Sequence, residues 1–256
     1  MQKHMIWTRG LKDWTYDQKL FSKSDRVVHL PCVNLKKIVI RDVKDIADFF
    51  TLGATYAIFT SVNGVELCLQ NSEILHIFRS KCQGIYTVGE KARRALEQYQ
   101  LQDLHKGSRD YAQELGQNIL ESAQVGQQFF LPGAAERAFD FEKFLQGYSY
   151  RSLSLNCYKT LKGAFGKNGQ AVSSFLDLGI SSEIIENGVL CFASPSAVIG
   201  YHNACPSRDS IWKQKPIAVA IGKTTYASCR DFSQRHLAST PNLQGLVAAA
   251  REILDS

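Results

Sequence analysis

Short turns rich in serine, threonine and glycine follow several apolar runs of this chain, and such turns can hold an anion. The run AIGKTT, from Ala220 to Thr225, ends in Gly-Lys-Thr, which also closes a phosphate-binding P-loop. A P-loop needs a further glycine five residues before the Gly-Lys pair, and Ile217 occupies that position within an apolar run. The sequence therefore predicts an anion-friendly turn here, and it argues against a nucleotide site.

Two further turns have the same form. FTSVNGV, from Phe59, places Thr60 and Ser61 after an apolar run, and FASPSAV, from Phe192, places Ser194 at the corresponding point. If a helix follows each turn, unpaired N–H groups and the positive end of the helix dipole face the turn. Such turns suit the oxygens of an anionic ligand, although serine and threonine at these positions also cap helices.

Composition argues against several functional classes. The chain has 256 residues, 45% of them hydrophobic, which predicts one or two domains with a buried core. Its seven cysteines show no C-x-x-C spacing, which favours reduced thiols over a disulfide framework or a zinc site. The net charge of +6 is not gathered in a basic run, and no apolar stretch suits a signal peptide or a membrane span. We therefore expect a cytoplasmic protein with no metal or other cofactor and no nucleic-acid or membrane partner.

The chain also repeats itself. YAIFTSVNGVELCL, from Tyr56, corresponds to VLCFASPSAVIGYH, from Val189, and at the same spacing TVGEKARRAL corresponds to AIGKTTYASC. IWTRG near the N-terminus resembles FFLPG at Phe129 to Gly133, and VHLPCV resembles SLNCYK. Apolar runs alternate with helix-period patterns, which predicts parallel sheets covered by helices. The expected fold is α/β, with two similar parallel-sheet domains of the Rossmann- or flavodoxin-like kind.

The order and spacing of FTS-x-N-G-V, VGEKA, the Tyr-Lys-Thr of LNCYKT, FASPSAV and AIGKTT resemble the uroporphyrinogen-III synthase family over nearly the whole chain. The resemblance implies two α/β domains joined by a two-stranded β connector, with the active site in the cleft between them. One domain would comprise residues 1–30 and 159–256, and the other residues 31–158. The connector strands would lie near 27–33 and 152–158.

The resemblance also implies a reaction. The substrate would be hydroxymethylbilane, a linear tetrapyrrole with eight carboxylates, and a lyase would cyclise it to uroporphyrinogen III. The last ring is inverted and water is lost, without metal or cofactor, and we expect a monomer. Residues 1–30 and 159–256 hold 16 Lys and Arg against 10 Asp and Glu, whereas residues 31–158 hold 14 of each. The excess positive charge in one domain would attract such an anion.

Tyr158 matches the connector tyrosine of the family, which implies a catalytic role. A phenol is protonated at neutral pH and can donate to the departing hydroxyl. Ala92 stands where the family usually has threonine. Either Arg93 and Arg94, which follow it, take over the role of that threonine, or the contact is not needed. The residues expected to hold the substrate's carboxylates are Thr60, Ser61, Ser194, Lys223, Thr224, Thr225, Arg9 and Arg137, the arginines being suited to bidentate contacts.

Other functions remain open at this point. A two-lobed, non-enzymatic protein that binds an anionic small molecule would have a similar architecture, because a fold does not determine function. A degenerate synthase homologue that binds a tetrapyrrole without converting it is a second alternative. A nucleotide-binding enzyme is a third, disfavoured by the missing glycine.

Overall fold

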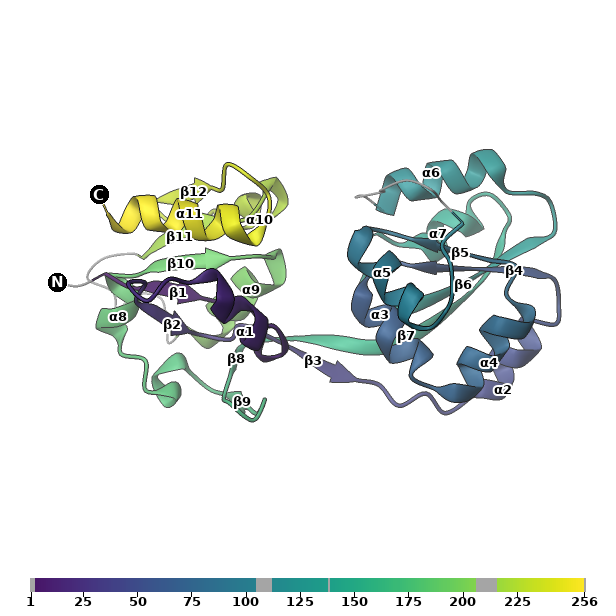
Figure 1. Cartoon of the computed structure of the whole chain (residues 1–256), viewed down its shortest axis with the longest axis horizontal. Coiled ribbons are helices and arrows are strands. Elements are labelled where there is room, and N and C mark those ends of the chain that lie inside the picture. The colour runs from purple at the N-terminus through teal and green to yellow at the C-terminus, as the bar shows by residue number, and fades with distance from the viewer. Residues whose placement is uncertain (1–2, 105–111, 138, 206–215, 256) are drawn as a thin grey trace. The chain divides into compact units, whose positions relative to one another are not determined.

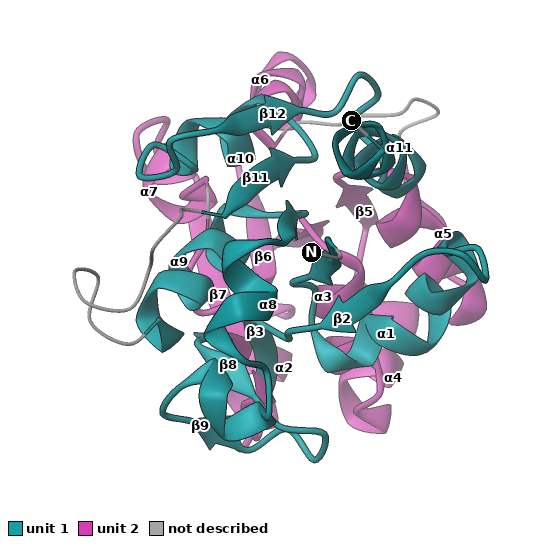
Figure 2. Cartoon of the chain, turned by 90° about the vertical axis from the view of Figure 1, so that its left-hand side faces the viewer, with its two compact units in different colours: residues 1–35, 160–256 teal, residues 36–159 magenta. Residues whose placement is uncertain are grey.

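The computed structural model describes residues 3–104, 112–137, 139–205 and 216–255 (Figure 1). The chain divides into two compact units, which we call unit 1 (Met1–Leu35 and Thr160–Ser256) and unit 2 (Lys36–Lys159) (Figure 2). Unit 1 is therefore discontinuous in sequence and unit 2 continuous. The boundaries follow Leu35 and Lys159, where positions 30 and 158 were expected from the sequence.

Unit 1 is built on a sheet of five parallel strands in the order β12-β11-β10-β1-β2. The strands are β1 (Met5–Trp7), β2 (Val27–His29), β10 (Val189–Phe192), β11 (Ile217–Ala220) and β12 (Arg235–Leu237). The helices are α1 (Leu11–Asp17), α8 (Ser182–Glu186), α9 (Pro195–Ala204), α10 (Lys223–Ser228) and α11 (Leu243–Leu254), with 3-10 turns at Gln18–Leu20 and Phe175–Leu178. Two short antiparallel strands, β8 (Ala164–Phe165) and β9 (Ala171–Val172), form a separate hairpin.

Alternate residues of these strands enter two separate hydrophobic clusters. Leu190 of β10 lies in one cluster with Val198 of α9, whereas Cys191 lies in the other with Leu246 of α11. Both faces of the sheet are thus covered by helices. This burial explains why the strands read as continuous apolar runs instead of alternating polar and apolar residues.

Unit 2 carries a second five-stranded sheet, in the order β3-β7-β6-β4-β5. The strands are β3 (Val33–Lys37), β4 (Ala54–Phe59), β5 (Gly84–Thr87), β6 (Gln127–Ala134) and β7 (Arg151–Lys162), and the pairs β4–β5, β4–β6 and β6–β7 are parallel. The helices are α2 (Val43–Phe49), α3 (Val62–Leu69), α4 (Ser72–Lys81), α5 (Glu90–Gln98), α6 (Ala112–Ser122) and α7 (Phe141–Gln146). The fold is thus α/β with parallel sheets, as the sequence predicts.

The strand expected near residues 27–33 differs from the prediction. Val27–His29 is β2 and pairs with β1 inside the unit 1 sheet, and a separate strand, β3, begins only at Val33. Pro31 lies in the break and has no N–H to donate to a neighbouring strand, which explains why one continuous strand does not form. The second expected strand, 152–158, is longer than predicted, because β7 runs from Arg151 to Lys162.

No helix within the described ranges is long and apolar enough to cross a membrane. Among the same residues there is also no group of three or more His, Cys, Asp or Glu side chains placed to hold a metal ion.

Candidate active site

In unit 2, Thr60 and Ser61 lie where β4 ends and α3 begins. Ser61 is the N-cap of α3, and its Oγ accepts a hydrogen bond from the backbone N–H of Gly64 at 3.0 Å. A serine N-cap typically contributes about 1 kcal/mol to helix stability. The turn that was predicted to hold an anion therefore has a structural role as well.

The first turn of α3 packs against the end of β6, and Gly64 lies at this contact. A Cβ atom at Gly64 would lie 3.3 Å from Ser61 Oγ and 3.4 Å from both Gly133 Cα and the Pro132 carbonyl oxygen. The distances to the two backbone atoms are ordinary van der Waals contacts, so the tight contact is the one with Ser61 Oγ. The absence of a side chain at Gly64 thus leaves room for the Ser61 hydroxyl.

Tyr158 lies on β7 beside an irregularity in the pairing with β6. Gly133 pairs with Asn156 and Ala134 pairs with Tyr158, so Cys157 is an extra residue opposite the β6 strand. Such a bulge changes the direction in which the following side chain points, and bulges are common next to active sites. The Tyr158 carbonyl accepts a hydrogen bond from the Ala135 N–H at 2.8 Å, which fixes the backbone on the far side of the bulge.

The side chains of Tyr158 and Ser61 meet. The phenol oxygen of Tyr158 lies 3.0 Å from Ser61 Oγ, and either oxygen can act as the donor. Tyr158 is only 6% exposed, so most of its ring is packed and the hydroxyl has a fixed position. Two residues that the sequence predicted separately, one as catalytic and one as substrate-binding, are thus joined in a single hydrogen-bonded pair.

Arg137 also belongs to this group of residues. Its Nη1 donates to Ser154 Oγ at 2.9 Å and its Nη2 donates to the Leu131 carbonyl at 2.7 Å, linking β7 to β6. Ser154 Oγ in turn donates to Glu142 Oε2 at 2.6 Å. Burial lowers the pKa of the Arg137 guanidinium from its ordinary value, although Glu142 opposes this change. The guanidinium is therefore already engaged by its own unit on the side that faces the strands.

Gly133 separates Arg137 from Thr60. A Cβ atom added to Gly133 would lie 3.7 Å from Arg137 Nε and 4.0 Å from Thr60 Oγ1. Thr60, Ser61, Arg137 and Tyr158 are therefore gathered around one glycine at the end of β6. The structure brings together all four of the candidates that unit 2 contains.

All seven cysteines are free thiols. Cys157, the extra residue of the bulge, forms a hydrogen bond with the thiol of Cys68 on α3, and burial raises the pKa of Cys68. Cys32, which occupies the matching place in the sequence repeat, lies in the hydrophobic core of unit 1.

In unit 1, Ser194 has the same local role as Ser61. It is the N-cap of α9, its Oγ accepts from the Ala197 N–H at 3.2 Å, and Pro195 takes the first helical position. The GKTT turn begins α10, where Gly222 has extended backbone and no side chain caps the helix. Lys223 and Thr224 are exposed, whereas Thr225 is 4% exposed.

Arg9 was expected to bind a carboxylate of the substrate, but its guanidinium is already paired within unit 1. Its Nη1 lies 2.5 Å from Asp17 Oδ1 and its Nη2 lies 3.0 Å from Asp13 Oδ2. Asp17 is buried and also accepts from Trp7 Nε1 at 2.8 Å. The forked donors of Arg9 are thus held by carboxylates of α1, a segment that sequence reasoning left without a role.

The N-terminus of α5 carries its own negative charge. Glu90 bonds to Arg93 at 2.6 Å and to Arg94 at 2.9 Å, and these guanidinium groups lower the pKa of Glu90 to about 2. Ala92 is buried on the opposite side of the turn. Arg93 and Arg94, one of the two explanations offered for Ala92, are paired with Glu90.

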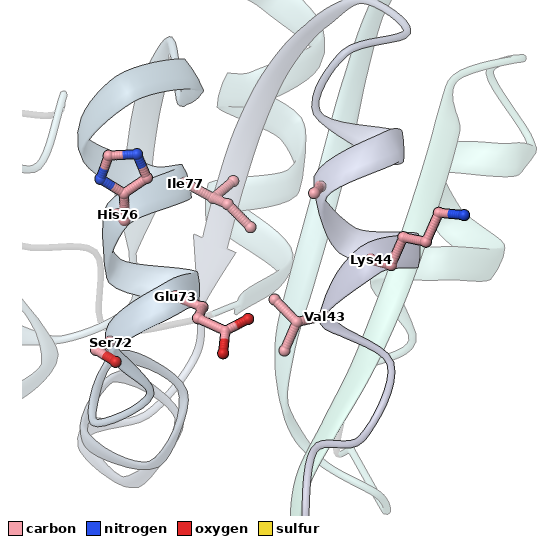
Figure 3. A pocket seen from close by; sticks show the side chains of 7 residues that line it. Val43, Lys44, Ser72, Glu73, His76 and Ile77 are labelled. Atoms are coloured by element: carbon pink, nitrogen blue, oxygen red, sulfur yellow. The ribbon is translucent and has the colours of Figure 1, made fainter.

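A groove of about 500 Å³ lies between α2 and α4, away from these turns (Figure 3). Val43 and Glu73 face one another across it, whereas Lys44 points away from α4 (Figure 3). None of the candidate residues lines this groove, so it is separate from the group around Gly133.

Sequence reasoning missed several residues that shape the unit 2 group. Ser154 and Glu142 support Arg137 and belong to no motif, whereas Gly64 and Gly133 lie in FTSVNGV and FFLPG without having been given a role. The one available signal was the match between FFLPG and IWTRG, which drew attention to the end of β6 without revealing its partners.

Comparisons with known proteins agree with this architecture. A family model described as uroporphyrinogen-III synthase HemD matches residues 15–248. The solved uroporphyrinogen-III synthetase of Helicobacter pylori superposes with a TM-score of 0.65 at 14% identity, covering 98% of this chain and 100% of that one. A mutant uroporphyrinogen III synthase from Thermus thermophilus also gives 0.65, at 17% identity, covering 98% and 99%.

At 14% and 17% sequence identity, these two structural matches show a shared fold only. A comparison with curated protein sequences finds no significant match. The family model covers most of the chain, including every candidate site residue except Arg9. On that evidence, the chain belongs to the uroporphyrinogen-III synthase family.

Proposed function

We propose that the chain cyclises hydroxymethylbilane to uroporphyrinogen III and that Tyr158 is the proton donor. Membership of the family supports the reaction, a lyase step of tetrapyrrole (haem) biosynthesis. The observation that supports Tyr158 is its phenol oxygen, which lies 3.0 Å from the hydroxyl of Ser61 in the turn after β4. Ligands of open α/β sheets bind at the carboxyl ends of the strands, and this phenol lies at such an end.

In the proposed reaction, the C–O bond of the substrate's hydroxymethyl group breaks and its electrons leave with the oxygen. Tyr158 gives its proton to that oxygen, which departs as water and leaves a protonated, positively charged azafulvene. The substituted carbon of the terminal ring attacks the azafulvene, and the spiro intermediate then breaks and recloses with ring D inverted. The proton released at the last step replaces the one that Tyr158 gave, so the net change is the loss of one water.

The main task of the protein is to select the inverted closure. The uncatalysed bilane closes without inversion, so the enzyme must hold the substrate in the other geometry. Positioning of this kind can supply up to roughly 7–11 kcal/mol in favourable cases. Hydrogen bonds to charged groups, at about 1.5–3 kcal/mol each, are a suitable means of holding the carboxylates. The residues that we propose for this task are Thr60, Arg137, Ser194, Lys223 and Thr224.

Three expected binding residues are better suited to other roles. Arg9 is paired with Asp13 and Asp17, so we propose that it anchors α1. Thr225 is buried, and we propose that it packs the first turn of α10 against its own unit. The hydroxyl of Ser61 is engaged by Gly64 and Tyr158, and we treat it separately below.

We propose further that the two units are copies of one fold, connected through β3 and β7. Reading the second sheet from its other end gives the order β5-β4-β6-β7-β3, against β12-β11-β10-β1-β2 in the first. The sequence repeat equates β4 with β10, β5 with β11, β6 with β1 and β7 with β2. These four strands occupy neighbouring places in both sheets, in the same order.

We also propose that the enzyme is a cytoplasmic monomer that works without a cofactor. Every group invoked in the mechanism belongs to one chain. Light scattering at working concentration tests the monomer, and activity that survives chelators and exhaustive dialysis is expected.

An isomer assay tests the proposed reaction. A deaminase generates hydroxymethylbilane in the presence of the protein, and the oxidised products are separated chromatographically into type I and type III uroporphyrins. We expect predominantly type III. Type I formed at the uncatalysed rate, from protein shown to be folded, would reduce the chain to a binder of tetrapyrroles or other anions.

A further inference from the structure

The hydrogen bond between Ser61 and Tyr158 has a direction that matters for catalysis. A hydroxyl has one proton and two lone pairs. If Tyr158 donates to Ser61, the only proton of the phenol points into the protein and is inaccessible to a substrate. If Ser61 donates to Tyr158, the phenol proton is free to be given away.

The contacts of Ser61 favour the second direction. The Gly64 N–H can only donate, so Ser61 Oγ accepts its hydrogen bond at 3.0 Å. Accepting that bond polarises the Ser61 hydroxyl and makes it a better donor, because hydrogen bonds in a chain strengthen one another. The positive end of the α3 dipole acts in the same sense. The chain of donors then runs from Gly64 through Ser61 to the Tyr158 oxygen.

We propose that Ser61 is a positioning residue, whose hydroxyl donates to the Tyr158 oxygen and directs the phenol proton toward the substrate. This inference rests on the proposed function, because it assumes that Tyr158 is the proton donor. It changes the role expected for Ser61 from holding a carboxylate to acting through another residue. The missing side chain at Gly64 is consistent with this role, since a Cβ atom there would lie only 3.3 Å from Ser61 Oγ.

A double-mutant cycle in the full-length chain tests the proposal. The variants are Ser61→Ala, Tyr158→Phe and the two combined, and type III formation is measured at saturating bilane to give kcat, and at varied bilane to give KM. We expect Ser61→Ala to lower kcat about tenfold with little change in KM, within the range of general acid catalysis. In the Tyr158→Phe background the same substitution should change kcat by less than about twofold, because residues that act through one another are not additive.

Two further variants separate this role from helix capping. Ser61→Thr keeps both the cap and the donor, and it should restore most of the wild-type kcat. Ser181→Ala removes a matched serine cap, that of α8, which accepts from the Ile184 N–H at 3.4 Å. It should leave kcat unchanged. If Ser61→Ala does not fold, Ser61→Asp keeps a capping oxygen that cannot donate, and its loss of kcat should likewise vanish in the Tyr158→Phe background.

The outcomes are distinguishable. An equal loss of kcat from Ser61→Ala with and without the phenol would overturn the proposal and return Ser61 to substrate binding or capping. A rise in KM alone would do the same. Full activity of Tyr158→Phe would overturn both this inference and the assignment of Tyr158 as proton donor. If the wild-type protein yields only the type I isomer, the proposed synthase activity itself is wrong.

Discussion

Tyr158 owes its surroundings to one extra residue in β7, and Arg137 holds the two strands together just before that irregularity. The guanidinium bonds to Leu131 on β6 and to Ser154 on β7, and Glu142 supports Ser154 from α7. A planar fork is suited to partners in two directions, whereas a lysine ammonium is a single point charge on a flexible stem. The role of Arg137 in shaping the site is thus open to a direct test.

We expect Arg137→Lys to lower the free energy of unfolding by about 2 kcal/mol, because a lysine cannot replace both part-buried hydrogen bonds of the guanidinium. Type III formation should fall as well, since the bulge that places Tyr158 loses its support. Urea unfolding and the isomer assay measure the two effects. Arg41→Lys, at an exposed arginine of the same unit, is the control and should change stability by less than about 0.5 kcal/mol. Identical urea midpoints for Arg137→Lys and wild type would contradict this account.

Ser61 caps helix α3, and Gly64 in the first turn leaves room for its hydroxyl. In an ordinary helix, replacing glycine by alanine gains up to about 1 kcal/mol. At Gly64 the new methyl group would lie 3.3 Å from Ser61 Oγ, closer than side chains normally approach, so the Ser61 hydroxyl would have to move. The first turn of the helix, and not only the Ser61 side chain, therefore affects the contact between Ser61 and Tyr158.

We expect Gly64→Ala to gain no stability and to lower type III formation roughly tenfold, because small displacements at a positioned group have large effects on rate. Gly163→Ala is a suitable control, since a Cβ atom there meets no atom within 4 Å. Thermal unfolding and single-turnover kinetics follow the two properties. A Gly64→Ala protein that is more stable and fully active would show that the close approach is unimportant.

The strands and turns that could be predicted from the sequence are those whose features lie close together along the chain. The turns after β4, β10 and β11 each combine a buried strand with serine, threonine or glycine, and these features lie within a few consecutive residues. The bulge at Cys157 and the partners of Arg137 and Arg9 were not predicted, because they depend on how segments far apart in the sequence align. The misplaced strand near residues 27–33 has a local cause, Pro31, whose significance was overlooked.

At the scale of the whole molecule, two sheets with separate cores carry the proposed binding residues. Nearly all of the excess positive charge lies in unit 1, which also holds Ser194, Lys223 and Thr224. The proposed proton donor and its supporting residues all lie in unit 2. The proposed proton transfer thus belongs to unit 2.

The most direct test of this assignment is the isomer assay applied to Tyr158→Phe. At saturating bilane we expect type III formation to fall by at least about a hundredfold, so that the uncatalysed type I isomer predominates. Urea unfolding and product affinity should stay close to wild type, and Tyr148→Phe, at an exposed tyrosine of the same unit, should be fully active. A Tyr158→Phe protein that makes type III at the wild-type rate would contradict the central claim.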